Sequence, residues 1–276
     1  MKLLIVAFLL TISLVSCSDN LPKERFSPFP FEPKVTETSD SLFVEYINEV
    51  ACPVQFKINT NFADPTGKYA NRTPIIVSPF DTLKLSFKKP ELSEKPERYF
   101  SYKGSEIGNP TEVVFDTATR YVYPFPKGRW YKVIQGYNGD FSHKSDYSRF
   151  AIDFALAIGD TVCATRDGIV VGVVKDYNVG GKDRKYRDYA NFITLYHKDG
   201  SFSQYVHLKQ NSVFVSLGDT VKTFQPIGLS GMTGFTSTPH LHFNTIKPTI
   251  SGVVGFPVKF LQLNGEDLKR GIKVEH

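Results

Sequence analysis

The chain has 276 residues, of which 41% are hydrophobic and 14% aromatic, and this proportion is ample for two folded cores. Its formal net charge of +5 is modest and gives no reason to expect a nucleic-acid-binding protein. Three cysteines do not make the disulfide framework of a small secreted domain.

The start of the chain is a charged residue followed by a short apolar run, residues 3–15. Such a run is too short to cross a membrane comfortably and is typical of a secretory signal. It ends in the four residues 14–17, Leu-Val-Ser-Cys, which look like the lipobox of a bacterial lipoprotein. We therefore expect residues 1–17 to be a lipoprotein signal peptide and Cys17 to carry the lipid, which makes an exported protein anchored to a membrane and facing the periplasm. The alternative is an ordinary signal peptide that is cut near Ser16.

Two regions of different composition follow the signal. Residues 18–34 are rich in proline and phenylalanine, and we expect a partly extended tether. Residues 35–125 contain short alternating apolar runs separated by turn formers, which predict a small antiparallel sandwich of the immunoglobulin-like kind. This sandwich contains no histidine, so the sequence assigns it no chemistry. A spacer, a shield over a substrate site or a docking module for a regulatory protein all stay open.

All six histidines lie in the second half of the chain, residues 126–276. Strand-like runs recur through this half, and they predict a mostly antiparallel β domain that can bring distant residues to one groove. The chain as a whole is therefore predicted to be all-β. The runs are residues 131–134, 150–154, 168–174, 191–197, 203–207 and 240–246.

Two histidines stand out in residues 239–243, Pro-His-Leu-His-Phe. Side chains alternate along a strand, so His240 and His242 point the same way. They can hold a metal between them, or one can bind it while the other reaches toward what the metal activates. A hydrogen-bonded pair on a polar sheet face is the other interpretation of such a motif.

A single carboxylate, Asp153, interrupts the apolar run at residues 150–154. A buried anion is costly unless a cation or a metal compensates it, so Asp153 is a candidate metal ligand. A buried salt bridge to Arg149 or Arg166 is the alternative.

Three motifs follow one another in the second half: Tyr-Val-His-Leu at residues 205–208, Ser-Gly-Met-Thr-Gly at 230–234 and His-Leu-His-Phe at 240–243. In this order, together with Asp153, they resemble the lysostaphin-type (LytM-like) murein metallopeptidases over roughly residues 131–260. The resemblance implies a zinc endopeptidase that cuts peptide cross-links of peptidoglycan. It also implies one catalytic zinc ion per chain, held by three protein ligands with water in the fourth position.

The first zinc ligand departs from the family pattern. That pattern, His-x-x-x-Asp, would place a histidine four residues before Asp153, where this chain has Arg149. The nearest histidine is His143, separated from Asp153 by a polar segment with turn formers. We expect His143, Asp153 and His242 to bind zinc. If Arg149 has instead replaced the ligand, the chain is a catalytically inactive murein-binding or regulatory protein of the same fold.

Four further residues receive roles from the resemblance. His207 and His240 are expected to be catalytic, one orienting or deprotonating water and the other stabilising the oxyanion or protonating the leaving amine, without a choice between them. Asn191 and Tyr205 match family positions near the groove and are expected to bind substrate, with ordinary sheet packing as the alternative. His197, at the end of a strand, is expected to be structural.

The last prediction concerns the substrate and the rim of the groove. The basic insert at residues 179–187 is expected to be a mobile rim loop that contacts an acidic stem peptide of peptidoglycan, or else plain solvated surface. Cross-links between D-alanine and a diamino acid suit a lipoprotein from a two-membrane envelope better than glycine bridges do.

Overall fold

The computed structural model describes residues 21–26, 29, 32–60, 74–88, 100–114 and 118–276. In these residues nearly all regular structure is β, which confirms the predicted all-β class, and the helices are two short 3₁₀ turns. None of the described helices is long and apolar enough to cross a membrane. The predicted signal peptide, Cys17 and the start of the predicted tether lie outside the described residues.

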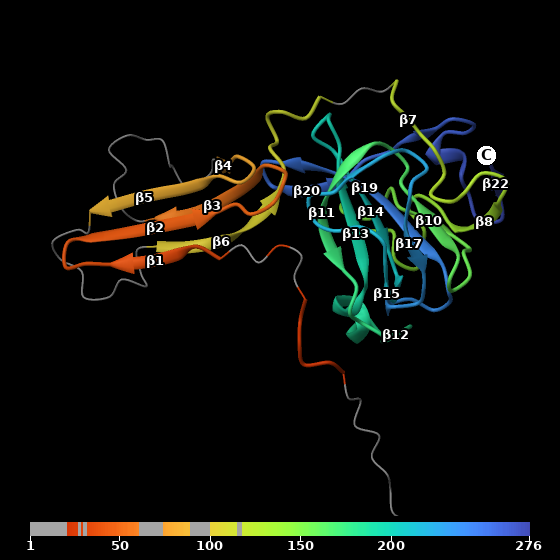
Figure 1. The fold of residues 1–276 in the computed structure, drawn as a ribbon, viewed down its shortest axis with the longest axis horizontal. Helices are drawn as coiled ribbons and strands as arrows, with labels where there is room; N and C mark the ends of the chain where they lie inside the picture. Colours follow the sequence, from red (N-terminus) through yellow and green to blue (C-terminus); the bar gives the residue numbers. More distant parts are fainter. Residues whose placement is uncertain (1–20, 27–28, 30–31, 61–73, 89–99, 115–117) are drawn as a thin grey trace, which may run out of the picture.

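The N-terminal strands form an elongated lobe of two three-stranded antiparallel sheets (Figure 1). Alternation of apolar and polar residues along these strands turns one face of each sheet inward, onto a shared buried cluster. The six described strands form a small sandwich. The assignment of this sandwich to the immunoglobulin-like type stays a prediction. The sheets have the orders β1 (Lys34–Glu37), β2 (Ser41–Ile47), β5 (Thr82–Lys88) and β4 (Ile75–Val77), β3 (Val54–Thr60), β6 (Phe100–Ile107).

The C-terminal lobe is built on one large antiparallel sheet. A smaller antiparallel sheet and two short parallel pairs complete it. The large sheet has the order β16 (Thr220–Val221), β11 (Gly168–Val174), β13 (Phe192–Tyr196), β14 (Phe202–Val206), β19 (Leu241–Thr249), β9 (Ile152–Phe154), β8 (Trp130–Gln135), β22 (Lys273–Glu275), and β20 (Gly252–Gly255) pairs with β19. The smaller sheet is β10 (Thr161–Cys163), β17 (Pro226–Ser230), β15 (Leu208–Val213), and the pairs are β12 (Gly180–Gly181) with β18 (Gly234–Phe235) and β21 (Lys259–Phe260) with β7 (Arg120–Tyr121).

The core of this lobe lies on one face of strands β9, β14 and β19. Ile152, Phe154, Tyr205, Leu241 and Phe243 all belong to its buried cluster. Because side chains alternate along a strand, the residues between them face the other way. The opposite face of the sheet is therefore where polar side chains of β9 and β19 can meet.

The two lobes share packing, so the sequence does not divide into independent pieces. Val171, Phe202 and Ile246 of the large sheet belong to the buried cluster of the N-terminal lobe. Two aromatic residues before β8, Tyr123 and Phe125, are buried in the C-terminal core. The domain boundaries drawn from the sequence stay predictions, with the segment around residues 121–125 packing on the C-terminal side.

Candidate metal centre

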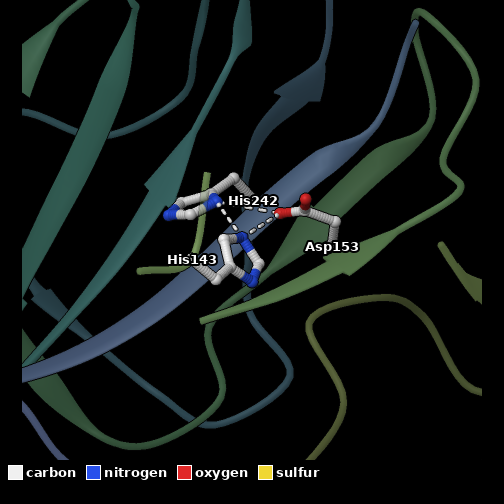
Figure 2. Close-up of side chains that lie close together, drawn as sticks. All are labelled: His143, Asp153 and His242. Carbon is white, nitrogen blue, oxygen red and sulfur yellow. Dashed lines mark hydrogen bonds and ion pairs between the residues drawn. The ribbon is translucent and has the colours of Figure 1, made fainter. Parts of the chain in front are cut away.

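Three side chains predicted as ligands converge at one point. Asp153 on β9 and His242 on β19 are paired in register, and His143 comes from the loop between β8 and β9. His143 Nε2 lies 3.2 Å from Asp153 Oδ1 and 3.2 Å from His242 Nδ1, while His242 Nδ1 lies 2.8 Å from Asp153 Oδ1 (Figure 2). The structure thus brings together three residues that are far apart in the sequence, and their role as ligands stays a prediction.

The spacing of these atoms fits a zinc ion. Zinc binds nitrogen and oxygen ligands at about 2.0–2.1 Å, and a tetrahedral arrangement separates two such ligand atoms by about 3.3 Å. The three measured separations, 2.8 to 3.2 Å, are close to this value. Two imidazole nitrogens and one carboxylate oxygen also form a donor set that zinc accepts.

Hydrogen bonds behind the cluster set the orientation of its ligands. His143 Nδ1–H donates to the carbonyl of Gly136 at 2.9 Å, so the lone pair of Nε2 faces the cluster. Gln135 Nε2 donates to Asp153 Oδ2 at 3.0 Å and to Ser142 Oγ at 2.9 Å, which leaves Asp153 Oδ1 for the cluster. Sequence reasoning missed Gln135, because only its register pairing with Asp153 across β8 and β9 reveals the contact.

The protonation states of Asp153 and His242 suit metal binding. Burial acts to raise the pKa of Asp153, but hydrogen bonds from His143 and His242 outweigh it and hold this pKa well below its ordinary value. Burial lowers the pKa of His242, against the opposing effect of Asp153. An ionised carboxylate and a neutral imidazole are the forms that bind a metal ion. For His143, burial is outweighed by the hydrogen bond to Asp153, and its pKa is raised.

Two more histidines border the cluster. Their ring centroids lie 4.7 Å apart, and His240 Nε2 lies 3.7 Å from Asp153 Oδ1. His207 Nδ1–H donates to the carbonyl of Thr233 at 2.6 Å, and His240 Nδ1–H donates to that of Thr238 at 2.8 Å. In each ring, Nε2 is therefore the nitrogen without a proton.

His207 also has an unusual backbone and an unusual pKa. Its φ of 68° lies in the left-handed region, which is rare for residues other than glycine and is concentrated at functional sites. Burial, followed by the neighbouring His240 and His242, lowers the pKa of His207 to about 3. The imidazole is therefore neutral at physiological pH.

A groove of about 570 Å³ opens beside the cluster and contains His207 and His242 in its lining. Phe141 and Phe235 stack at its border with ring centroids 5.0 Å apart. Other residues of the lining include Tyr147, Gln204, Arg184 and Arg187. Arg184 and Arg187 belong to the predicted basic insert, which is ordered as β12 and the 3₁₀ helix η2 (Arg184–Tyr189).

The structure corrects the expectation that Asn191 and Tyr205 contact substrate. Both side chains are completely buried. Asn191 uses its amide on the backbone of Tyr177 and Leu208, and the Tyr205 hydroxyl bonds to Thr165. Their hydrogen-bonding groups are thus satisfied inside the lobe, away from the groove.

The arginines proposed as alternative partners of Asp153 lie elsewhere. Arg149 is half-exposed, 3.5 Å from Asp146, and its guanidinium lies 4.9 Å from the ring of Phe150. Arg166 pairs with Asp199 at 2.9 Å. Among the described residues, therefore, Asp153 is compensated by histidines and not by an arginine.

His197 occupies a position that fits its expected structural role. It is completely buried, its Nδ1–H donates to the carbonyl of Asp167 at 2.8 Å, and its Nε2 accepts from Ser203 Oγ at 2.9 Å. Both ring nitrogens are used within the lobe, so His197 has no free atom for the groove.

Comparison with known proteins identifies the family. Residues 148–253 match the model of Peptidase family M23, a match that begins just after His143. The peptidoglycan DD-endopeptidase ShyA of Vibrio cholerae is 33% identical over 112 residues, which cover 41% of this chain and 22% of that protein. The glycyl-glycine endopeptidase ALE-1 of Staphylococcus capitis is 36% identical over 120 residues, which cover 43% of this chain and 30% of that protein.

One solved structure covers a similar part of the chain. The catalytic domain of the antimicrobial peptidase lysostaphin from Staphylococcus simulans is 26% identical and covers 46% of this chain and 87% of that one, with a TM-score of 0.31. The chain spans less than a third of the length of the curated relatives named above. Residues 148–253 thus contain a Peptidase family M23 domain, which is homologous to that of lysostaphin.

Proposed function

We propose that the chain is a zinc-dependent endopeptidase that hydrolyses peptide cross-links of bacterial peptidoglycan. The observation that carries the proposal is the convergence of His143, Asp153 and His242 at zinc-ligand spacing beside His207 and His240. Membership of a peptidase family and relatives that are named as peptidoglycan and glycyl-glycine endopeptidases support the same activity.

The chemistry divides between the bound ion and the protein. His143, Asp153 and His242 would hold one zinc ion per chain, which acidifies a water molecule and polarises a carbonyl group when it is bound. His207 and His240 each present Nε2 next to the cluster, because a backbone carbonyl holds the proton on Nδ1. Between them they accept the proton of the attacking water and deliver a proton to the leaving amine.

The alternative function is a catalytically inactive murein-binding or regulatory protein. It rested on Arg149 at the position where the family has a histidine. The half-exposed position of Arg149, paired with Asp146, removes the reason to regard it as a replacement ligand. The presence of His143 in the cluster supports the catalytic proposal instead.

For the cellular setting we propose an exported lipoprotein that is anchored through Cys17 to a membrane of the cell envelope. Its support is the apolar leader and the Leu-Val-Ser-Cys motif at residues 14–17. The substrate partner is then the stem peptides of peptidoglycan, and the N-terminal lobe is available to a regulatory protein.

Digestion of cross-linked muropeptides tests the proposed activity. The purified chain is expected to convert cross-linked dimers to monomers, to stop when the metal is removed with a chelator, and to recover when zinc is restored. The matched variants are His207→Ala, which is expected to abolish turnover, and Arg149→Ala, which is expected to retain it. A zinc-loaded chain that binds muropeptides without cleaving them would establish the alternative function.

A further inference from the structure

The basic insert contains a three-residue repeat, Arg-Lys-Tyr-Arg-Asp-Tyr, which coincides with the 3₁₀ helix η2. A 3₁₀ helix has three residues per turn, so side chains three positions apart lie one above the other. The repeat therefore gives η2 three faces of distinct chemistry: two arginines, two tyrosines, and a mixed face. These faces are Arg184 with Arg187, Tyr186 with Tyr189, and Lys185 with Asp188.

The tyrosine face is anchored in the lobe. Tyr189 is buried in a cluster with Val174 and Tyr177. Its hydroxyl donates to the carbonyl of Pro22 at 3.0 Å, and the Arg25 guanidinium lies 4.0 Å from its ring centroid. Residues 21–26 of the predicted tether therefore pack against η2 and hold the helix in one rotational setting.

The start of the insert and the start of η2 are also held. At the start of the insert, β12 pairs with β18 through Gly180 and Gly234, next to the groove residue Phe235. The Asp183 carboxylate accepts a hydrogen bond from the backbone N–H of Lys185 at 3.0 Å and caps η2. Because the start of the insert, the start of η2 and the tyrosine face are fixed, the direction of the arginine face is fixed as well.

The arginine face borders the groove that opens beside the candidate metal centre. Arg184 and Arg187 both line this groove together with His207 and His242. A rise of about 2.0 Å per residue separates the two arginine attachment points by about 6 Å along the helix.

The two guanidinium groups have no anionic partner in the part of the chain that the structure describes. Across the groove, Lys144 already pairs with Asp140 at 3.0 Å. Two acids are adjacent to these arginines in the sequence: Asp183 is used as the cap of η2, and Asp188 lies on the mixed face of the helix and interacts electrostatically with Arg25. The groove therefore has one wall with two exposed positive charges that are available to a ligand.

We propose that Arg184 and Arg187 bind a free carboxylate of the peptide substrate, so that the preferred cross-link is an anionic one. This inference rests on the proposed function. A guanidinium is a planar fork of donors that matches a carboxylate with two parallel hydrogen bonds. A diamino-dicarboxylic acid that is acylated on one amine by D-alanine keeps such a carboxylate beside the scissile amide, whereas a glycine bridge offers only neutral amides.

Binding, measured separately from turnover, tests this inference. The probes are two D-alanyl cross-link peptides with a ketomethylene group in place of the scissile amide, identical except that the diamino acid carries a carboxylate in one and a carboxamide in the other. The zinc-loaded chain is titrated with each peptide by calorimetry. We expect the carboxylate peptide to bind about tenfold more tightly, as charge-assisted pairs predict, and the preference to shrink as salt is raised.

Variants show which charges carry the preference. The double substitution Arg184→Gln with Arg187→Gln is expected to make the two affinities equal, and each single substitution to give an intermediate preference. Lys182→Gln removes one charge from the same insert outside the groove lining and is expected to keep the full preference. All of these positions are exposed, and thermal melting checks that the variants stay folded.

Two results would overturn the inference: equal affinities in the parent chain, or a loss of preference in Lys182→Gln as large as in the double variant. Failure of the proposed function has a different signature. A chain that prefers the carboxylate peptide but does not cleave muropeptides would support the inference and contradict the proposed activity. A chain that cleaves muropeptides but binds both probes equally would support the proposed activity and contradict the inference.

Discussion

Gln135 is the residue through which the structure makes its most specific prediction about the metal centre. Its side-chain amide joins three parts of the site: Nε2 donates to Asp153 Oδ2 and Ser142 Oγ, and Oε1 accepts from the backbone N–H of Phe141 at 3.1 Å. Two of these contacts lie in the loop that carries His143. Gln135→Leu keeps a side chain of similar size and removes all three hydrogen bonds, although it touches no metal-binding atom.

The expected magnitude follows from the charge on Asp153. A hydrogen bond to an ionised group contributes about 1.5–3 kcal/mol, and neutral bonds about 1 kcal/mol. Loss of such support behind a ligand typically weakens metal binding by about 10-fold to 100-fold, which corresponds to about 1.4–2.7 kcal/mol. We therefore expect the zinc dissociation constant of Gln135→Leu to rise by this factor, measured by competition with a chromophoric chelator.

The matched control is Gln210→Leu. Gln210 also donates a side-chain hydrogen bond to a backbone carbonyl, that of Asp176 at 2.7 Å, but it does not contact the cluster. Zinc affinity in this control is expected to equal that of the parent chain. A zinc affinity of Gln135→Leu within about twofold of the parent would refute the idea that this hydrogen-bond network supports the centre.

Three further predictions concern the surroundings of the site. Tyr205→Phe should lower the free energy of unfolding by about 1–3 kcal/mol, since a buried hydroxyl network is broken, and should leave KM unchanged; a raised KM would restore Tyr205 as a substrate contact. Burial, followed by the positive charge of Arg166, lowers the pKa of His197 from 6.5 to about 4. The contribution of His197 to the free energy of unfolding is therefore constant above pH 6.5 and falls by about 3 kcal/mol as pH drops toward 4. Urea unfolding of His197→Gln should lose this part of the pH dependence, and an unchanged dependence would contradict the assignment. Gly234→Ala should destabilise the fold by about 1–3 kcal/mol more than Gly218→Ala, as measured by thermal melting. Both glycines have φ above +80°, but only at Gly234 would the new Cβ lie 2.5 Å from another residue. Equal losses of stability would rule out the steric contact.

Local patterns in the sequence predicted the parts of the site that depend on strand alternation. The His-Leu-His motif at residues 240–242 predicted two imidazoles on one side, and both indeed lie within 3.7 Å of Asp153 Oδ1. The isolated carboxylate of Asp153 in an apolar run correctly indicated a buried anion in need of compensation. These inferences need only the two-residue period of a strand and the cost of burying charge.

Strand geometry explains why Tyr205, which the family resemblance placed near the groove, is buried. If β14 continued through His207, residues 205 and 207 would share a face. The strand instead ends at Val206, and the positive φ of His207 turns the chain. Tyr205 therefore points into the core while His207 lines the groove. A local change of backbone conformation of this kind leaves no clear mark on the sequence.

The remaining features depend on contacts between distant segments. Gln135 meets Asp153 only because β8 pairs with β9. The arginine face of η2 is exact because η2 is a 3₁₀ helix, which places residues three apart one above the other, whereas an α-helix would set them about 60° apart around its axis. Single-sequence patterns carry neither strand partners nor helix type, so these parts had to come from the structure.

Zinc content of the purified chain, measured by mass spectrometry of the metal beside His143→Ala and Arg149→Ala, addresses the metal centre directly. We predict one zinc ion per chain in the parent and in Arg149→Ala, because Arg149 lies on the surface with Asp146. His143→Ala should lose the ion, because it removes one of the three converging atoms. A parent chain without zinc, or zinc retained in His143→Ala, would contradict the assignment of the centre.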